Sequence, residues 1–212
     1  MKFRVIPAIL SDNEVEIKKK LELIRTFSEI ASVDIIDGTI TENNILPSPE
    51  IFKPYTDSLF LELHMIVSHP ETFVSAYPGF KRYIGHVEKI DVNHFVKEVT
   101  VRGAEAWLGL TTKTPAEAVL DESLIEKGIS GFTILSVRGG YSGDEFEREA
   151  LLKVRKIRDF FGDKVDIEVD GGINDTTITL AKEAGANLFI ANSYLFKSDD
   201  PKVKFNELAG YL

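Results

Sequence analysis

Short apolar runs rich in β-branched residues recur along the whole chain. They alternate with segments whose apolar residues are spaced three and four apart. Runs of the first kind predict buried strands, and the second spacing predicts amphipathic helices. Helical spacing is clearest in segments 14–27, 114–128 and 145–161. The predicted strands number eight and cover residues 3–10, 32–37, 59–67, 82–88, 106–111, 131–137, 164–170 and 188–196.

Several predicted helices are flanked by residues that favour helix ends. Thr114, which precedes a proline, predicts a helix start there, and Asp175 or Thr176 predicts a start near residue 177. Gly128 and Gly185 stand where two helices should end, as expected of residues that adopt the left-handed conformation at a C-terminus.

The alternation of strand and helix predicts parallel βαβ units. Eight such units in 212 residues predict an α/β protein with a compact (β/α)8 TIM barrel, as one domain spanning residues 1–212. An open doubly wound sheet is the main rival. No GxGxxG motif follows the first predicted strand, however, so the nucleotide fingerprint of that fold is missing.

Composition narrows the range of partners. The net charge is -9 and no basic block is present, which argues against binding nucleic acid or an anionic membrane. There are no cysteines, so disulfides, thiolate metal sites and cysteine nucleophiles are excluded. No apolar window approaches the roughly 18 residues of a membrane span, and the N-terminus lacks the features of a signal peptide. We therefore expect a cytoplasmic protein.

Three side chains capable of acid-base chemistry lie at the ends of predicted strands. They are Asp34, His64 and Asp170, each followed by a loop. Because side chains alternate along a strand, the aliphatic neighbours of Asp34 would face the helices and Asp34 would face inward. The loop-side ends of barrel strands converge on one mouth, where barrel enzymes carry out their chemistry. The pattern predicts proton transfer on a small molecule, with a metal ion as one option.

Each of these residues also has a structural interpretation. An aspartate at a strand end often only shapes a turn, and Asp170 before two glycines fits that role. A lone histidine in a strand is more often a satisfied core residue than a ligand. Of the other histidines, we expect His69 in a loop entering a helix and His94 on a helix surface, while His86 could lie at the mouth or in the core.

Seven motifs follow one another in the order typical of a known family, over nearly the whole chain. They are VIPAILSDN, VDIIDGTITENN, LELHMIVSHPE, HVE, SVRGGYSGDEF, IEVDGGI and AGANLFIANSYLF, with a TP pair between the fourth and fifth. In these motifs the chain resembles the ribulose-phosphate 3-epimerase family. That family consists of (β/α)8 enzymes that invert carbon 3 of a ketopentose 5-phosphate.

The resemblance implies a role for each of the three mouth residues. Asp34 and Asp170 would be the two catalytic acid-base groups, one on each face of carbon 3. Two groups are needed because one base can return a proton only to the face from which it took it. Asp34, His64 and Asp170 would also be ligands of a divalent metal ion (zinc, manganese, iron or cobalt) that stabilises the enediolate.

The resemblance also implies a phosphate site at the opposite rim, formed by loop amides and helix N-termini. Glycines suit such a site because backbone amides can approach a phosphate closely there, although the same glycines could merely shape tight turns. The matching positions are Gly140, Tyr141, Ser142, Gly143, Gly171, Gly172, Asn192 and Ser193.

The site departs from the family pattern at several positions. Ser32 stands where the family has a metal-ligating histidine, and a hydroxyl is the poorer ligand, so we expect weaker metal binding. Ala8 replaces a serine that contacts substrate. Three methionines of the pocket wall are replaced by aliphatic residues, which keep the wall apolar; these are Ile36, Ile66 and Leu135.

The departures leave two main hypotheses. In the first, the protein is an epimerase that converts D-ribulose 5-phosphate to D-xylulose 5-phosphate. In the second, it is a sugar-phosphate-binding barrel whose chemistry is lost or changed. A decarboxylase or aldolase is disfavoured because the lysine such barrels use is missing from the second and sixth predicted strands. The family's members are often oligomers, so a homo-oligomer is also expected.

Overall fold

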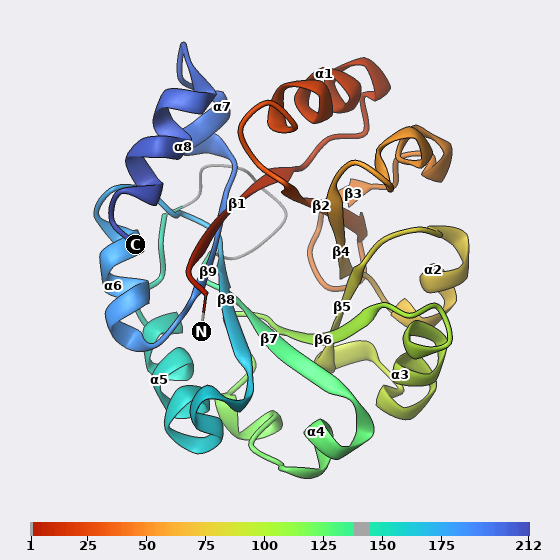
Figure 1. Cartoon of the computed structure of the whole chain (residues 1–212). Coiled ribbons are helices and arrows are strands. Elements are labelled where there is room, and N and C mark those ends of the chain that lie inside the picture. Colours follow the sequence, from red (N-terminus) through yellow and green to blue (C-terminus); the bar gives the residue numbers. More distant parts are fainter. Residues whose placement is uncertain (1, 138–144) are drawn as a thin grey trace.

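The strands of the chain form a closed parallel barrel, and Figure 1 looks down its axis. The computed structural model describes residues 2–137 and 145–212. Within these residues the sheet contains nine strands, in the order β1-β9-β8-β7-β6-β5-β4-β2-β3, and an additional β1–β2 pairing closes it. The strands are β1 Arg4–Ile9, β2 Ile30–Asp37, β3 Asn44–Ile45, β4 Phe60–Ile66, β5 Arg82–His86, β6 Glu105–Leu110, β7 Ile129–Leu135, β8 Asp166–Asp170 and β9 Leu188–Ala191.

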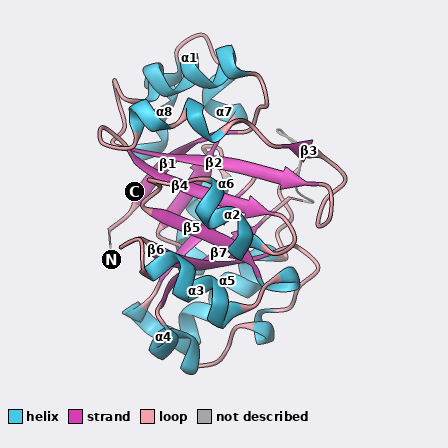
Figure 2. Ribbon diagram, turned by 90° about the vertical axis from the view of Figure 1, so that its right-hand side faces the viewer, coloured by secondary structure: helices cyan, strands magenta, loops and turns pink. Residues whose placement is uncertain are grey.

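Eight of these strands are parallel, and the strand arrows of β1 and β4 in Figure 2 point the same way. The ninth, β3, is a two-residue antiparallel extension of β2. The predicted TIM barrel is therefore confirmed. At the closure, β1 pairs with β9 as well as with β2, and the buried side chain of Asn187 donates to the carbonyl of Lys2 and accepts from the amide of Ile167.

Helices surround the barrel and bury the outward faces of its strands. The helices of the described part of the chain are α1 Glu14–Ile24, α2 Pro70–Ala76, α3 Val92–Thr100, α4 Ser123–Lys127, α5 Ala150–Phe161, α6 Thr177–Ala184, α7 Ser193–Phe196 and α8 Pro201–Ala209. None of the helices described is long and apolar enough to cross a membrane. The main core lies between helices and strands, and a second, smaller cluster fills the barrel interior around Ile84 and Trp107.

Helix ends follow the sequence signals in part. Gly128 and Gly185 both have a φ of 109° and end α4 and α6, as predicted. At the start of α6, the capping acceptor is the Asn174 side chain, which receives the amides of residues 176 and 177, so neither residue expected to cap this helix does so. Thr114 does not begin an α-helix either: only the 3-10 turn Ala116–Ala118 follows, and the Thr114 hydroxyl donates to Glu88.

The last predicted strand was too long. The run 188–196 is apolar except for Asn192 and Ser193, and these two residues mark the break: β9 ends at Ala191 and Ser193–Phe196 forms the single-turn helix α7. An apolar run of this length does not distinguish a strand from a strand followed by a buried helical turn. The correction matters because it places Asn192 and Ser193 in the loop and helix start at the mouth of the barrel.

Candidate active site

Asp34, His64 and Asp170 meet at the end of the barrel, as strand parity predicted. Asp34 and His64 are direct neighbours across β2 and β4, while Asp170 ends β8. The Nδ1 atom of His64 lies 3.0 Å from Asp34 Oδ1 and 3.0 Å from Asp170 Oδ2. The side chains of Asp34 and His64 are buried, whereas that of Asp170 keeps 14% of its surface exposed. The group therefore opens toward solvent on the Asp170 side.

These residues fit a divalent cation by their donor chemistry. One imidazole nitrogen and two carboxylate oxygens lie within 4.8 Å of one another. Imidazole and carboxylate ligands are used by zinc, iron and manganese, and three protein ligands with an open position are ordinary for a catalytic centre. The Asp34-His64-Asp170 group could therefore hold such an ion, although the donors do not by themselves identify it.

The three groups shift one another's ionisation. Burial raises the pKa of Asp34 to about 6, against the hydrogen bond with His64 and with a further contribution from the charge of Asp170. Burial acts to lower the pKa of His64, but its two carboxylate partners outweigh burial and raise that pKa well above the usual value. The pKa of Asp34 therefore lies nearer to neutral pH than that of an exposed aspartate.

The remaining histidines separate into one that touches this group and two that do not. His86, whose position was ambiguous, is fully buried and its Nε2 lies 2.9 Å from Nε2 of His64. Burial lowers the pKa of His86. His69 immediately precedes α2 with a φ of 53°, and His94 is exposed on α3, both as predicted.

A layer of buried charge lies beneath the aspartates. Arg82 Nη1 lies 2.8 Å from Glu62 Oε2 and 3.9 Å from Glu168 Oε2, and Arg82 Nε donates to Glu105 at 2.9 Å. The guanidinium also stacks over the Trp107 ring, 3.8 Å from its centroid. Burial and the neighbouring charge of Glu62 raise the pKa of Glu168 well above its usual range.

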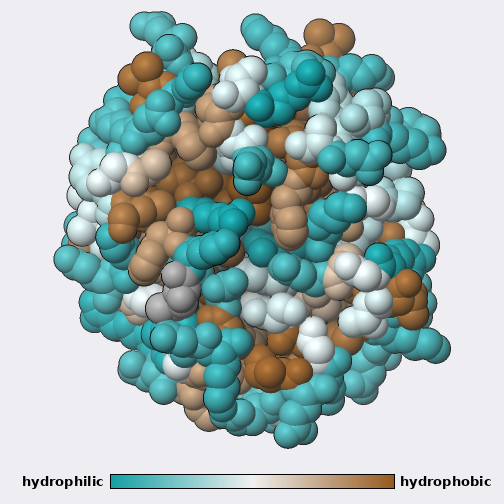
Figure 3. All heavy atoms as spheres, in the orientation of Figure 1, coloured by the Kyte–Doolittle hydropathy of each residue, from teal (hydrophilic) through white to brown (hydrophobic). Residues whose placement is uncertain are grey.

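This ionic layer borders the lower opening of the barrel. Figure 3, which looks onto the end where β1 begins, shows hydrophilic residues at the centre of the face. A pocket of about 510 Å³ opens there, and its lining includes Lys2, Arg4, Arg82, Glu105 and Asp166.

The apolar wall expected at the mouth is present in part. Ile36 and Ile66 pack together with Ile45 in a small cluster of buried residues. Leu135 is also buried but does not belong to that cluster. Ser32 is 1% exposed and pairs with Glu62 in the register of β2 and β4, one layer below Asp34.

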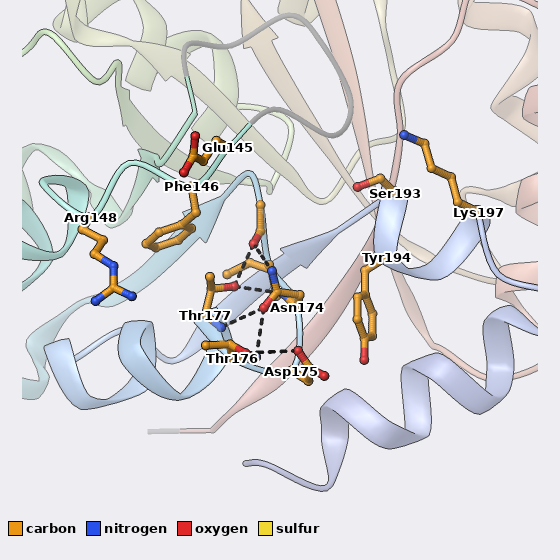
Figure 4. Close-up of a pocket in the computed structure, with 12 residues that line it drawn as sticks. Glu145, Phe146, Arg148, Asn174, Asp175, Thr176, Thr177, Ser193, Tyr194 and Lys197 are labelled. Atoms are coloured by element: carbon orange, nitrogen blue, oxygen red, sulfur yellow. Dashed lines mark hydrogen bonds between the residues drawn. The ribbon is translucent and has the colours of Figure 1, made fainter.

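A second pocket of about 690 Å³ opens between the start of α6 and the start of α7 (Figure 4). Asp34, His64 and Asp170 do not line it, and its nearest lining residue in sequence to Asp170 is Gly172. Gly172 and Ser193 line it, as the predicted phosphate site requires, while Gly171 and Asn192 do not. The positions Gly140 to Gly143 lie outside the described residues. Two cationic side chains that the sequence did not single out, Arg148 and Lys197, also line this pocket.

The loop after β8 is held in a conformation that requires glycine. Gly171 has a φ of +111° and Gly172 a φ of +64°. A Cβ at Gly171 would lie 2.5 Å from Val137 Cγ2. The Ser136 hydroxyl donates to the carbonyl of Gly171 at 2.6 Å, and the Thr177 hydroxyl donates to that of Gly172 at 2.7 Å. The backbone between Asp170 and the second pocket is therefore fixed from both sides.

Sequence reasoning did not identify Arg82 as the cation of the buried layer, or Glu88 as the acceptor for Thr111 and Thr114. Alternation in β5 places Arg82, Ile84 and His86 on one face, so the inward direction of Arg82 could have been read from the same parity as Asp34. The residues that pair with Arg82 could not be predicted in this way, because the contacts of its side chain depend on how the neighbouring strands are staggered. Glu88 follows β5 and was seen only as part of the HVE motif.

Comparisons with known proteins agree with this architecture. The model of the family described as "Ribulose-phosphate 3 epimerase family" matches residues 4–196. A ribulose-phosphate 3-epimerase from Mycobacterium bovis is 33% identical over 177 residues, covering 80% of this chain and 76% of the relative. The cytoplasmic isoform from Oryza sativa subsp. japonica is 27% identical over 205 residues, covering 93% and 89%.

Solved structures share the fold at lower identity. A 3-hexulose-6-phosphate synthase superposes with a TM-score of 0.70 at 16% identity, covering 100% of both chains. A 3-keto-L-gulonate-6-phosphate decarboxylase from Vibrio cholerae O1 biovar El Tor superposes with a TM-score of 0.72 at 12% identity, covering 100% of this chain and 97% of the other. These likenesses establish only the barrel. From the family match and the relative at 33% identity, the chain belongs to the ribulose-phosphate 3-epimerase family, whose members are isomerases.

Proposed function

We propose that this protein inverts carbon 3 of a ketopentose 5-phosphate, converting D-ribulose 5-phosphate to D-xylulose 5-phosphate, with residues 1–212 acting as one barrel. The observation that carries the proposal is the placement of two carboxylates around one point. Asp34 Oδ1 and Asp170 Oδ2 each lie 3.0 Å from the same His64 nitrogen, yet they come from strands β2 and β8. Two carboxylates from different strands can address two faces of one carbon.

In the proposed reaction, one aspartate removes the proton from carbon 3 and the other delivers a proton to the opposite face. The raised pKa of Asp34 makes that carboxylate a stronger base than an exposed aspartate and lets it return a proton near neutral pH. A divalent metal ion held by Asp34, His64 and Asp170 would supply electrostatic stabilisation of the negative charge that develops on the substrate oxygens. The Nδ1 atom of His64 would be the third donor to that ion, and it lies 3.0 Å from one oxygen of each carboxylate.

The substrate's phosphate belongs, in this proposal, in the pocket lined by Gly172 and Ser193. Gly172, with a φ of +64°, has no side chain to keep a phosphate from its backbone, and Arg148 and Lys197 bring two positive charges to a lining that also contains Glu145 and Asp175. We extend the phosphate assignment to Gly140, Tyr141, Ser142, Gly143, Gly171 and Asn192 on the family resemblance. The same resemblance supports a cytoplasmic location and assembly into homo-oligomers.

The test is deuterium incorporation at carbon 3 of D-ribulose 5-phosphate in deuterium oxide, with and without added Zn²⁺ or Mn²⁺. Asp34→Asn and Asp170→Asn are each expected to reduce incorporation by about 10²–10⁴-fold, the usual contribution of a general acid-base group. Asp166→Asn is the matched control, because it lies at the far end of the same strand as Asp170 and an asparagine can still accept from Asn187. Unchanged incorporation in both active-site variants would falsify the assignment.

A changed activity remains the second candidate, favoured by Ser32 in place of a histidine ligand and by the rebuilt apolar wall. In that case the unmodified protein exchanges no proton with ribulose 5-phosphate. It should nevertheless bind ketose phosphates with an affinity that depends on the phosphate, or exchange protons with another ketose phosphate. Calorimetry with matched phosphorylated and unphosphorylated sugars distinguishes this outcome from an inactive protein that binds neither.

A further inference from the structure

A chain of polar contacts leads away from the candidate metal group into the barrel wall. His64 turns Nδ1 toward the two aspartates and Nε2 toward His86, 2.9 Å from the Nε2 of that second ring. The two rings are stacked, with centroids 5.2 Å apart and planes inclined by 21°. The Nδ1 atom of His86 lies 3.3 Å from Glu88 Oε2, and among the residues described these two buried atoms have no hydrogen-bond partner, so each is the polar group available to the other.

Glu88 sets the direction of this chain. Its Oε1 atom accepts the backbone amide of Thr111 at 2.9 Å and the hydroxyl of Thr114. A carboxylate that receives donors in this way is an acceptor, so the proton between Glu88 and His86 belongs on His86 Nδ1. Burial acts to raise the pKa of Glu88, but the neighbouring His86 and these two donors outweigh burial and lower that pKa to about 2.

Only one proton fits between the two Nε2 atoms at 2.9 Å. With Nδ1 of His86 already protonated, a second proton on its Nε2 would make His86 a cation with 0% of its surface exposed. The proton therefore belongs on Nε2 of His64, a ring that can carry charge because two carboxylates lie 3.0 Å from its Nδ1 atom; a cation bound at Nδ1 would take the place of the proton on that atom. His64 therefore donates through Nε2, and His86 accepts.

The barrel wall leaves a space shaped for the His86 ring. Gly109 pairs with His86 in the register of β5 and β6. A Cβ at Gly109 would lie 2.9 Å from His86 Nε2 and 3.0 Å from its Cδ2. The backbone of Gly109 does not have a positive φ, so the conformation itself does not require glycine there. Any larger residue would displace the ring that His64 contacts.

We propose that His86, oriented by Glu88 and accommodated by Gly109, is a positioning residue that holds the proton of His64 on Nε2 and thereby keeps the Nδ1 lone pair for a divalent cation between Asp34 and Asp170. The inference rests on the metal-binding role of His64 in the proposed function. A ligating histidine usually donates its second ring N–H to a carboxylate, carbonyl or water, which orients the ring. Here a second histidine is the acceptor, and a carboxylate is one step further away.

The first test needs no substrate. Nitrogen-15 spectra of the histidine rings in the full-length protein, with and without Zn²⁺, report which nitrogen carries each proton. We expect His86 as the Nδ1–H tautomer in both states, a retained Nε2–H on His64 in the zinc-bound protein, and a nitrogen-nitrogen coupling across the hydrogen bond between the two Nε2 atoms. A proton on Nε2 of His86, or no contact between the rings, would overturn the inference.

The second test measures Zn²⁺ affinity by competition with a chromophoric chelator. His86→Leu keeps apolar volume but removes the acceptor, and we expect an affinity lower by about 10–100-fold. His86→Gln offers a carbonyl oxygen to His64 and should restore most of the Zn²⁺ affinity. Gly109→Ala should weaken binding as well, whereas Gly131→Ala, which presses on Trp107 instead, should leave it unchanged.

The two tests separate the inference from the proposed function. Zinc binding that is lost in Asp34→Asn and weakened in His86→Leu, without any turnover of ribulose 5-phosphate, would sustain the inference and remove the epimerase proposal. Equal zinc affinity in His86→Leu and the unmodified protein, or no zinc binding at all, would overturn the inference whatever the activity. If His86→Leu does not fold, the nitrogen-15 spectra of the unmodified protein and the Zn²⁺ affinity of Gly109→Ala still test the inference.

Discussion

Replacing Arg82 by methionine should lower the free energy of unfolding, because buried carboxylates inside the barrel would lose their cation. The guanidinium is the cation that lies between Glu62 and Glu168, at 2.8 and 3.9 Å, and these carboxylates are 0% and 1% exposed. Removing one partner of a buried ion pair costs about 3–5 kcal/mol, because a charge remains buried without compensation. Methionine keeps part of the contact with Trp107, so we expect a loss of about 4 kcal/mol from a total of about 5–15 kcal/mol.

The loss should also depend on pH. Without the cation, the pKa of Glu168, already raised by burial and by Glu62, rises further. A carboxyl whose pKa is higher in the folded state than in the unfolded state destabilises the fold increasingly as the pH rises above the unfolded value of about 4.5. The difference between Arg82→Met and the unmodified protein should therefore be smallest near pH 4.5 and larger at pH 8.

Urea denaturation followed by circular dichroism measures these differences. Arg25→Met is the control, since it removes an exposed arginine whose ion pair with Glu22 spans 3.2 Å and which should contribute less than about 1 kcal/mol. Adding Glu62→Gln to Arg82→Met should recover a large part of the loss. A loss below about 1 kcal/mol, or one that Glu62→Gln does not relieve, would refute the view that Arg82 compensates buried charge.

Further predictions concern the mouth of the barrel. Ser32→His should raise zinc affinity in chelator competition, because it returns an imidazole to the strand that carries Asp34; no change would mean that residue 32 does not reach the ion. Gly171→Ala should cost about 2–3 kcal/mol of stability and weaken phosphate binding, since φ is +111° and the new Cβ would lie 2.5 Å from Val137 Cγ2; equal urea midpoints would contradict this. Carbon 3 exchange by the metal-free protein should fall as the pH drops below about 6, where Asp34 becomes protonated and can no longer accept a proton; a flat profile from pH 5 to 8 would exclude Asp34 as the titrating group.

The features that sequence could predict are those set by local covalent geometry. Alternation along a strand is a property of every extended chain, so the inward direction of Asp34, His64 and Asp170 followed once three strands were recognised. The barrel followed from the alternation of strands and helices, because parallel strands require crossover connections. These predictions did not depend on any contact between distant residues.

What the sequence could not predict depends on distances between elements. The contact of His64 with His86 requires the stagger of β4 against β5 and the empty space at Gly109. Only a 3-10 turn follows Thr114, whose hydroxyl donates to Glu88, a residue distant in sequence. In both cases a tertiary partner competes with a local preference, and a single sequence does not record which partner wins.

Closure of the barrel through β1 has a consequence for synthesis of the chain. The first strand leaves the ribosome early, but its partner β9 begins only at Leu188. At about 5–20 residues per second, one edge of β1 waits roughly 10–40 s for its neighbour. During that time an apolar strand keeps unpaired amides and carbonyls, a template for pairing with other chains. We expect nascent chains that stop before β9 to be the most aggregation-prone intermediates, and chaperones to be needed most over the last stretch of translation.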